Sequence, residues 1–192
     1  EFQGLRKDMI DGISEIDGIS HDGDTLIWGK KVSQAFRAKV REIAGRLRTD
    51  PNFLMAVMSA ETGATFDPAI RNPHPNSTAT GLIQFIESTA RGLGTTTAQL
   101  ARMSAVEQLE YVYKYYRPFT GKLNNLSDVY VTTMYPYAGY QGKPRDFVAF
   151  RKPSKEYDQN ASLDKDKKGY ITIADIAFRV ETWYKKGTKQ AG

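Results

Sequence analysis

The segment from residue 50 to residue 85, DPNFLMAVMSAETGATFDPAIRNPHPNSTATGLIQF, constrains the fold of this chain more than any other. Its first part predicts a short helix, because Asp50 is a favoured N-cap and Pro51 suits the first helical position. Gly63 can end that helix, since glycine readily adopts the left-handed conformation found at helix C-termini. Residues 64–80 are rich in Pro, Asn, Ser and Thr, so they predict a long loop after the helix.

A single acidic residue, Glu61, lies on the apolar face of this helix. The members of that face recur at helical spacing: Leu54, Val57, Met58 and Glu61. Partial burial disfavours a charged carboxylate, and so does the negative end of the helix dipole. Both effects raise the pKa, as a general acid that works near neutral pH requires. The alternative for this helix alone is a half-buried glutamate that bonds backbone or an arginine and has no catalytic role.

Further motifs follow Glu61 at a specific spacing: Phe66-Asp67-Pro68-Ala69, Asn72 and Gly81-Leu82-Ile83-Gln84-Phe85. Together with Glu61-Thr62 they resemble the lytic transglycosylase (SLT) domain of the goose-type lysozyme superfamily. In that family a glutamate ends a helix, an F-x-P-x-A segment follows, and a G-L-x-Q segment opens the next helix. The resemblance covers residues 36–150 and implies a mainly α, lysozyme-like helical domain with little or no β structure.

The resemblance also implies a chemistry, cleavage of the β-1,4 bond between MurNAc and GlcNAc in peptidoglycan. Glu61 matches the catalytic acid, and Gln84 matches the glutamine that lines the sugar cleft, with Phe85 and Asn72 as further substrate-binding candidates. In lytic transglycosylases the glutamate protonates the leaving oxygen and then takes the proton of the MurNAc C6 hydroxyl, which leaves a 1,6-anhydro sugar. No cofactor is expected for this catalysis.

Two alternatives remain open at this point. Goose-type lysozymes of the same superfamily hydrolyse the same bond with water, helped by additional acids, for which Asp67 and Glu87 are the nearby candidates. Asp67 can instead simply cap a turn before Pro68. The second alternative is a non-catalytic module that binds the cell wall. Two histidines and no cysteine leave little material for a nucleophilic triad or a zinc site.

The family places a tyrosine beside the catalytic glutamate, at the end of a later helix. Here the helix expected over residues 126–134 is followed by Tyr135-Pro136-Tyr137-Ala138-Gly139 and then Gly142-Lys143-Pro144. This departs from the common A-Y-N-A-G form and is similar to a variant found in phage-type members. Tyr135 is the best match for the active-site tyrosine, Tyr137 is the rival, and core packing is the alternative for each.

The segment from Asp164 to Asp175 follows the EF-hand loop in phase, with glycine at position six and an acid at position twelve. Its candidate metal ligands are Asp164, Asp166, Lys168, Tyr170 through its carbonyl, Thr172 and Asp175. Position five is Lys168 rather than an oxygen ligand, and position twelve is the shorter aspartate. The loop therefore predicts either a weak structural Ca²⁺ site or a loop that keeps the shape without the ion.

Three parts are expected along the chain: a turn-rich N-terminal arm over residues 1–32, the transglycosylase-like domain over 33–152, and the EF-hand-like loop with a C-terminal helix over 153–192. In the arm, Thr25 to Trp28 suggests a short strand, and Asp17, Asp22 and Asp24 are weak metal candidates. Further helices are expected over 36–47, 82–93, 104–117 and 173–185.

Composition limits the partners. The net charge of +5 favours acidic polymers, but no nucleic-acid motif is present, and no apolar run approaches the ~20 residues that span a membrane. We therefore expect peptidoglycan glycan strands as the partner, with neither nucleic acid binding nor membrane insertion. The resemblance implies action in the bacterial cell wall, by a phage virion or tail protein or an exported bacterial enzyme, as a monomer or as a domain of a larger protein.

Overall fold

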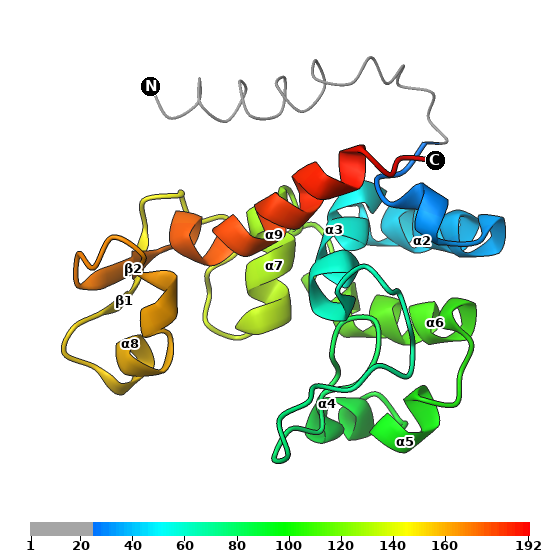
Figure 1. Cartoon of the computed structure of the whole chain (residues 1–192), viewed down its shortest axis with the longest axis horizontal. Coiled ribbons are helices and arrows are strands. Elements are labelled where there is room, and N and C mark those ends of the chain that lie inside the picture. The colour runs from blue at the N-terminus through cyan, green and yellow to red at the C-terminus, as the bar shows by residue number, and fades with distance from the viewer. Residues whose placement is uncertain (1–24) are drawn as a thin grey trace.

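The computed structural model describes residues 25–192, and the fold is mainly α with one two-stranded sheet, which confirms the predicted class. The central pair of helices is α3 (Pro51–Thr62) and α9 (Ile173–Thr188), which pack against each other. α2 (Gln34–Leu47) lies against α3 and α6 (Ala105–Tyr116), and α7 (Leu126–Met134) lies against α9. Figure 1 shows α9 running along the molecule above these helices.

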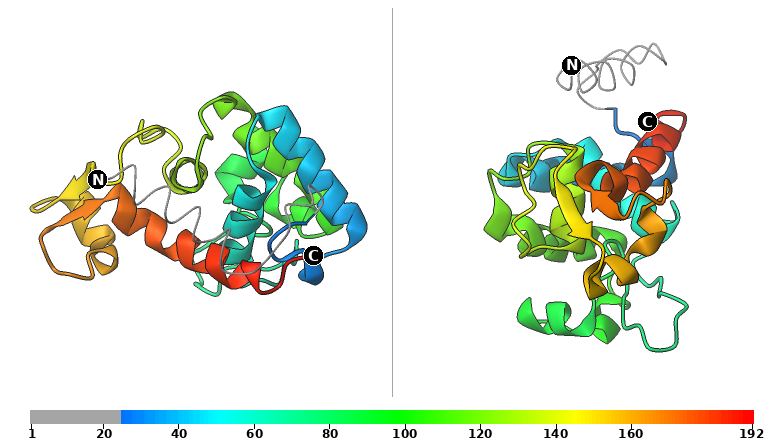
Figure 2. Two further views of the ribbon diagram at one scale, coloured as in Figure 1. Left: turned by 90° about the horizontal axis from the view of Figure 1, so that it is seen from above. Right: turned by 90° about the vertical axis from the view of Figure 1, so that its left-hand side faces the viewer.

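The remaining elements are short. α4 (Glu87–Gly92) and α5 (Thr97–Leu100) lie on the far side of α3 from α9, and α8 (Lys155–Gln159) packs on β1 (Val148–Arg151). β1 pairs in antiparallel fashion with β2 (Tyr170–Thr172). Single 3₁₀ turns occupy Gly29–Lys31, Arg117–Phe119 and Ala161–Leu163. Figure 2 shows that the sheet and α8 form one end of the molecule and α2 the other, with α9 joining them.

Helix boundaries follow the capping signals of the sequence. The Asp50 side chain accepts a hydrogen bond from Asn52 N at 2.8 Å, and Gly63 ends α3 in the left-handed conformation at φ 59°. Ser104 and Glu107 form a reciprocal capping box at the start of α6. Five predicted helices are confirmed within a few residues: the one between Asp50 and Gly63 and those at 36–47, 104–117, 126–134 and 173–185.

The helix expected over residues 82–93 is wrong at its start. Residues 81–84 form a turn closed by a bridge between Thr80 and Phe85, Gln84 has a positive φ of 57°, and α4 begins only at Glu87. Gln108 stabilises this turn, because its Oε1 accepts from Leu82 N at 2.8 Å and its Nε2 donates to Pro68 O at 2.9 Å. A Cβ at Gly81 would lie 2.3 Å from Gln108 Oε1, so only glycine fits there.

The first described residues do not form the expected strand. Leu26 exchanges two backbone hydrogen bonds with Gly192, but Trp28 adopts a positive φ of 59° and turns the chain into a 3₁₀ turn. The Trp28 ring is buried against Trp183 of α9, and its Nε1 donates to Trp183 O at 3.1 Å. The metal candidates Asp17, Asp22 and Asp24 lie outside the described residues.

None of the helices in residues 25–192 combines the length and the apolarity needed to cross a membrane.

Candidate active site

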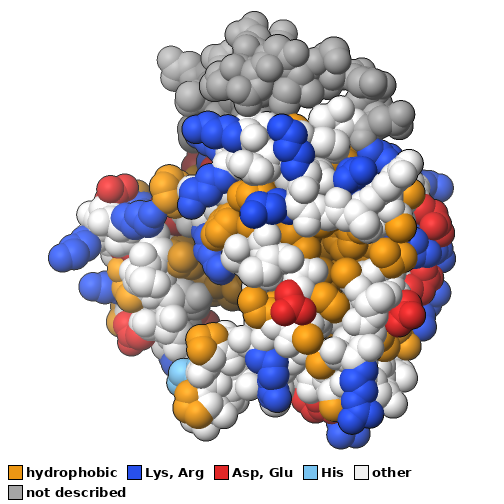
Figure 3. Space-filling view, turned by 45° about the vertical axis from the view of Figure 1, so that its right-hand side comes forward, with side chains coloured by type: hydrophobic (Ala, Val, Ile, Leu, Met, Phe, Trp, Pro, Cys, Tyr) orange, Lys and Arg blue, Asp and Glu red, His pale blue; other side chains and the backbone are white. Residues whose placement is uncertain are grey.

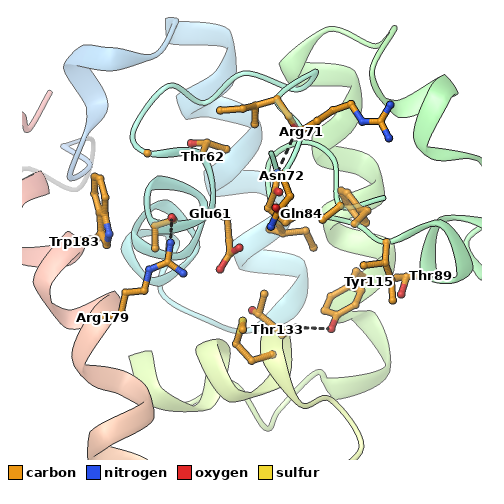
Figure 4. Close-up of a pocket in the computed structure, with 18 of the residues that line it drawn as sticks. Glu61, Thr62, Arg71, Asn72, Gln84, Thr89, Tyr115, Thr133, Arg179 and Trp183 are labelled. Carbon is orange, nitrogen blue, oxygen red and sulfur yellow. Dashed lines mark hydrogen bonds between the residues drawn. The ribbon is translucent and has the colours of Figure 1, made fainter. Parts of the chain in front are cut away.

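A cleft of about 660 Å³ opens at the C-terminal end of α3. Its walls come from that helix end, the loop through residue 86, the end of α7 and the middle of α9, and Figure 4 shows these elements around Glu61. Its polar and charged lining residues are Glu61, Thr62, Arg71, Asn72, Gln84, Thr89, Tyr115, Thr133 and Arg179. Glu61 is the only acid among the described residues that line it, so acid–base chemistry in this cleft depends on one carboxyl group.

Glu61 is half-buried, and its Oε1 is buried without a hydrogen-bond partner among the described residues. Removing a carboxylate from water without such partners disfavours its charged form. Burial accordingly raises the pKa of Glu61, while the positive charge of Arg179 opposes part of this rise. A glutamate whose pKa is raised in this way can keep its proton closer to neutral pH and can act as a general acid.

Three side chains from other helices surround Glu61. Arg179 Nη2 of α9 donates to Ala60 O at 2.8 Å, directly before Glu61 in the chain. Burial raises the pKa of Tyr130 on α7 and of Tyr116 on α6, and the charge of Glu61 adds to both rises. The charge effects place both tyrosines within electrostatic range of the Glu61 carboxyl group.

The structure brings three predicted substrate-binding residues to the cleft. Gln84 lines it while its Nε2 donates to Ile70 O and Gly81 O, at 3.2 and 3.0 Å, so its amide also fixes the turn. The Phe85 ring is buried and contacts Tyr115 edge-on, 6.5 Å between ring centroids. Asn72 is exposed in the loop wall, and its Oδ1 accepts from His74 N.

Tyr135 and Tyr137 are not among the residues that line this cleft, although Pro136 between them is. The Tyr135 hydroxyl donates to Asn160 Oδ1 at 2.7 Å, and its ring packs on Phe150 of β1. Tyr137 is 91 % exposed beside Phe119. Tyr130 of α7 lies close enough to Glu61 for the carboxylate charge to raise its pKa, but it is not a lining residue either.

The two candidate helper acids also lie outside the lining. Asp67 is exposed, and its Oδ1 accepts from Ala69 N at 2.8 Å, which is the turn-capping role considered for it. Glu87 accepts from the Thr97 hydroxyl and backbone N–H and pairs with Arg91 at 3.0 Å. The Thr97 bonds lower the pKa of Glu87 and hold it ionised. Both carboxylates are thus engaged elsewhere.

The sequence argument missed Arg179, Trp183, Tyr115 and Arg71, all of which line the cleft. For α9 a signal was available: Arg179 lies three residues after the buried Ile176 and four before Trp183, so helical spacing puts a basic residue on the stripe that carries both, although its side chain is exposed. The same reasoning had identified Glu61 on α3.

Figure 3 shows hydrophobic side chains gathered across the middle of one face of the molecule, with lysines and arginines above and below them.

In the EF-hand-like loop, Lys168 takes the place of the cation. Its Nζ lies 3.1 Å from Asp164 Oδ1 and 2.7 Å from Asp175 Oδ2 and so joins positions one and twelve. Asp164 is buried, and it also accepts from the Tyr157 hydroxyl at 2.6 Å and from Gly169 N at 2.8 Å. A calcium ion at this point would meet an ammonium group, so the donor set as arranged does not fit the ion.

The other predicted ligands contribute little to the position between Asp164 and Asp175 where Lys168 Nζ lies. The Asp166 side chain is exposed, and the Thr172 hydroxyl is used in the capping box of α9 with Asp175. The Tyr170 ring lies 5.1 Å from Lys168 Nζ. Within residues 25–192 no group of three or more histidine, aspartate and glutamate side chains is arranged to hold a metal ion.

Comparison of the chain with protein-family models and with curated proteins finds no match.

Proposed function

We propose that this protein cleaves the β-1,4 bond between MurNAc and GlcNAc in peptidoglycan, as a lytic transglycosylase in which Glu61 acts first as acid and then as base. The observation that carries the proposal is the state of the Glu61 carboxyl group. It lines a large cleft, and its Oε1 is buried with no hydrogen-bond partner among the described residues. Burial raises its pKa, as a general acid needs.

The cleft supports one catalytic acid rather than two. Most glycosidases use a pair of carboxyl groups on opposite sides of the scissile bond. Here Asp67 and Glu87 are engaged in a turn and in an α4–α5 contact, and Glu61 is the sole acid among the described lining residues. A single carboxyl group suits the transglycosylase route, in which the substrate's own C6 hydroxyl replaces the water that a second acid would activate.

The remaining lining residues suit a glycan strand. The amide of Gln84, the side chain of Asn72 and the Arg71 guanidinium supply polar groups along one wall, and Phe85, Met134 and Trp183 supply apolar surface. Sugar rings present hydroxyl and acetamido groups at their edges and C–H groups on their faces, so a mixed lining of this kind matches them. The partner is then the cell-wall glycan, and the site of action is the bacterial cell wall.

Glu61→Gln tests the proposal, because it removes the acid and keeps the shape of the side chain. Lysis of purified peptidoglycan should fall on the order of 10²–10⁴-fold. Glu87→Gln is the matched control, since it removes a carboxylate outside the cleft, and its lysis should stay near that of the wild type. Lysis by Glu61→Gln within threefold of the wild type would show that Glu61 is not the acid. A wild-type protein that binds the wall without cleaving it would instead be a binding module.

A further inference from the structure

Arg179 reaches the catalytic end of α3 from another helix. It is the seventh residue of α9, and its Nη2 donates to Ala60 O at 2.8 Å. Figure 4 shows the guanidinium directed toward the end of α3, with Glu61 beside it. Carbonyl groups in the last turn of a helix lack intrahelical partners and carry partial negative charge, so an arginine bonded there is held firmly.

The bond to Ala60 fixes Arg179 near Glu61 but not in contact with it. Of the ion pairs among residues 25–192, none joins the two side chains, although the charge of Arg179 acts on the Glu61 carboxyl group. A contact ion pair would hold Glu61 ionised and would prevent it from donating a proton. If Arg179 were absent, the Glu61 carboxylate formed after proton donation would be half-buried, and no positive charge would compensate it.

We propose that Arg179 is a positioning residue for Glu61, anchored on the Ala60 carbonyl outside ion-pair contact, where its charge stabilises the Glu61 anion after proton transfer without pairing with it. This inference rests on the proposed function. In the first step the Glu61 O–H bond breaks and a bond from that proton to the leaving sugar oxygen forms. In the second step the Glu61 carboxylate takes the proton of the C6 hydroxyl, whose oxygen bonds to C1. Arg179 transfers no proton in either step.

Among the other described groups around Glu61, none supplies a positive charge that acts on its carboxyl group as Arg179 does. Tyr130 from α7 and Tyr116 from α6 are neutral hydroxyls near pH 7, and burial raises the pKa of each further. Arg71 lines the same cleft from the loop and is exposed. Arg179 is exposed as well, but its charge, unlike that of Arg71, acts on the Glu61 carboxyl group. Water weakens this charge effect in the free protein. A bound glycan would displace that water, and the same charge would then act more strongly.

The test compares Arg179→Met, which removes the charge, with Arg179→Lys, which keeps it. Two readouts are needed: NMR titration of ¹³C-labelled glutamate carboxyl groups, with the Glu61 signal assigned by its loss in Glu61→Gln, and the pH profile of peptidoglycan lysis. In Arg179→Met the Glu61 carboxyl should titrate at higher pH than in the wild type, and the alkaline limb of the profile should move to higher pH. Maximal lysis should fall roughly tenfold, less than the ~10² lost with a direct hydrogen-bond donor.

Arg179→Lys should titrate close to the wild type, and Lys185→Met, which removes an exposed charge from the same helix, should leave both readouts unchanged. A merely structural arginine would lower the melting temperature and the rate in both variants without moving the titration. If Arg179→Met folds and its Glu61 carboxyl titrates at the same pH as in the wild type or at a lower pH, the inference is overturned. If Arg179→Met does not fold, a shift of the Glu61 titration in Arg179→Lys overturns it. The NMR titration needs no substrate, so it is independent of activity. If the wild-type protein does not cleave peptidoglycan but Arg179→Met still shifts the Glu61 titration, the proposed function is refuted and the effect of Arg179 on Glu61 stands.

Discussion

Two carboxyl groups held inside this molecule have opposite surroundings. The Asp164 side chain accepts from the Tyr157 hydroxyl, from the Gly169 N–H and from Lys168. Burial alone would raise the pKa of Asp164, but these bonds outweigh it and hold the pKa below its ordinary value. Glu61 has a buried oxygen with no partner in the described chain, and its pKa is raised. A carboxylate with all its partners stabilises a loop, whereas one lacking them retains a proton that it can give to a substrate.

The two regions are joined by one helix. α9 begins at the EF-hand-like loop, where Thr172 and Asp175 form its capping box, and its middle carries Arg179 into the cleft. The loop is distant from Glu61 in sequence, but it fixes the start of α9. That helix supplies Arg179, which is its only cationic side chain among the described lining residues. The Asp164 region thus contributes to the position of the cleft wall without taking part in the chemistry.

Asp164→Ala should produce the largest loss of stability. It removes the acceptor of four hydrogen bonds and leaves Tyr157 and Lys168 without their shared partner, so the melting temperature should fall by roughly 5–10 °C. Asp166→Ala, an exposed acid of the same loop, is the control and should melt near the wild type. Equal melting curves for both variants would mean that Asp164 contributes no more than a surface acid.

Lys168→Asn should convert the loop into a calcium-responsive one. The substitution removes the ammonium group and supplies an oxygen ligand at position five, so millimolar Ca²⁺ should raise the melting temperature of the variant by roughly 3–5 °C. The wild type should respond less, because its own cation occupies that point. Lys167→Asn, at the exposed neighbouring position, controls for the change in charge. A wild type that gains as much from Ca²⁺ as Lys168→Asn would favour the weak Ca²⁺ site over the loop that keeps its shape without the ion.

Glu61→Gln should change the melting temperature in the opposite direction to Asp164→Ala. The folded-state pKa of Glu61 lies above its unfolded value, so its favourable contribution is complete below the unfolded pKa of ~4.3 and is lost as the pH rises through the folded value. Replacing it with neutral glutamine should therefore raise the melting temperature at pH 7 and make little difference below about pH 4. A variant that is less stable than the wild type at pH 7 would show that Glu61 is satisfied in the folded protein.

Tyr135→Phe should give the smallest effect. It removes the hydrogen bond to Asn160 and should cost about 0.5–1.5 kcal/mol of unfolding free energy. The lysis rate per folded molecule should not change, because the hydroxyl is bonded to Asn160 and Tyr135 does not line the cleft. A rate loss of tenfold or more with little loss of stability would return Tyr135 to the catalytic site, as the resemblance had suggested.

Local signals explain what the sequence predicted well. The caps at Asp50, Gly63 and Ser104 depend on neighbouring residues alone, and the position of Glu61 on α3 follows from helical spacing. Residues 81–84 were misread as helix because Gln108, far along the chain, holds that turn. The packing of the Tyr135 ring on Phe150 is likewise beyond local signals, because Phe150 belongs to the β1 strand.

The most direct test of the central claim, that Glu61 alone serves as both acid and base, is mass spectrometry of the muropeptides released by the wild-type protein. With no second acid among the described lining residues, the account predicts products that end in 1,6-anhydroMurNAc and resist reduction by borohydride. Muropeptides that are each one water heavier and fully reducible would contradict it. That result would mean that water attacks the bond, and Asp67 or Glu87 would then have to reach the cleft when substrate is bound.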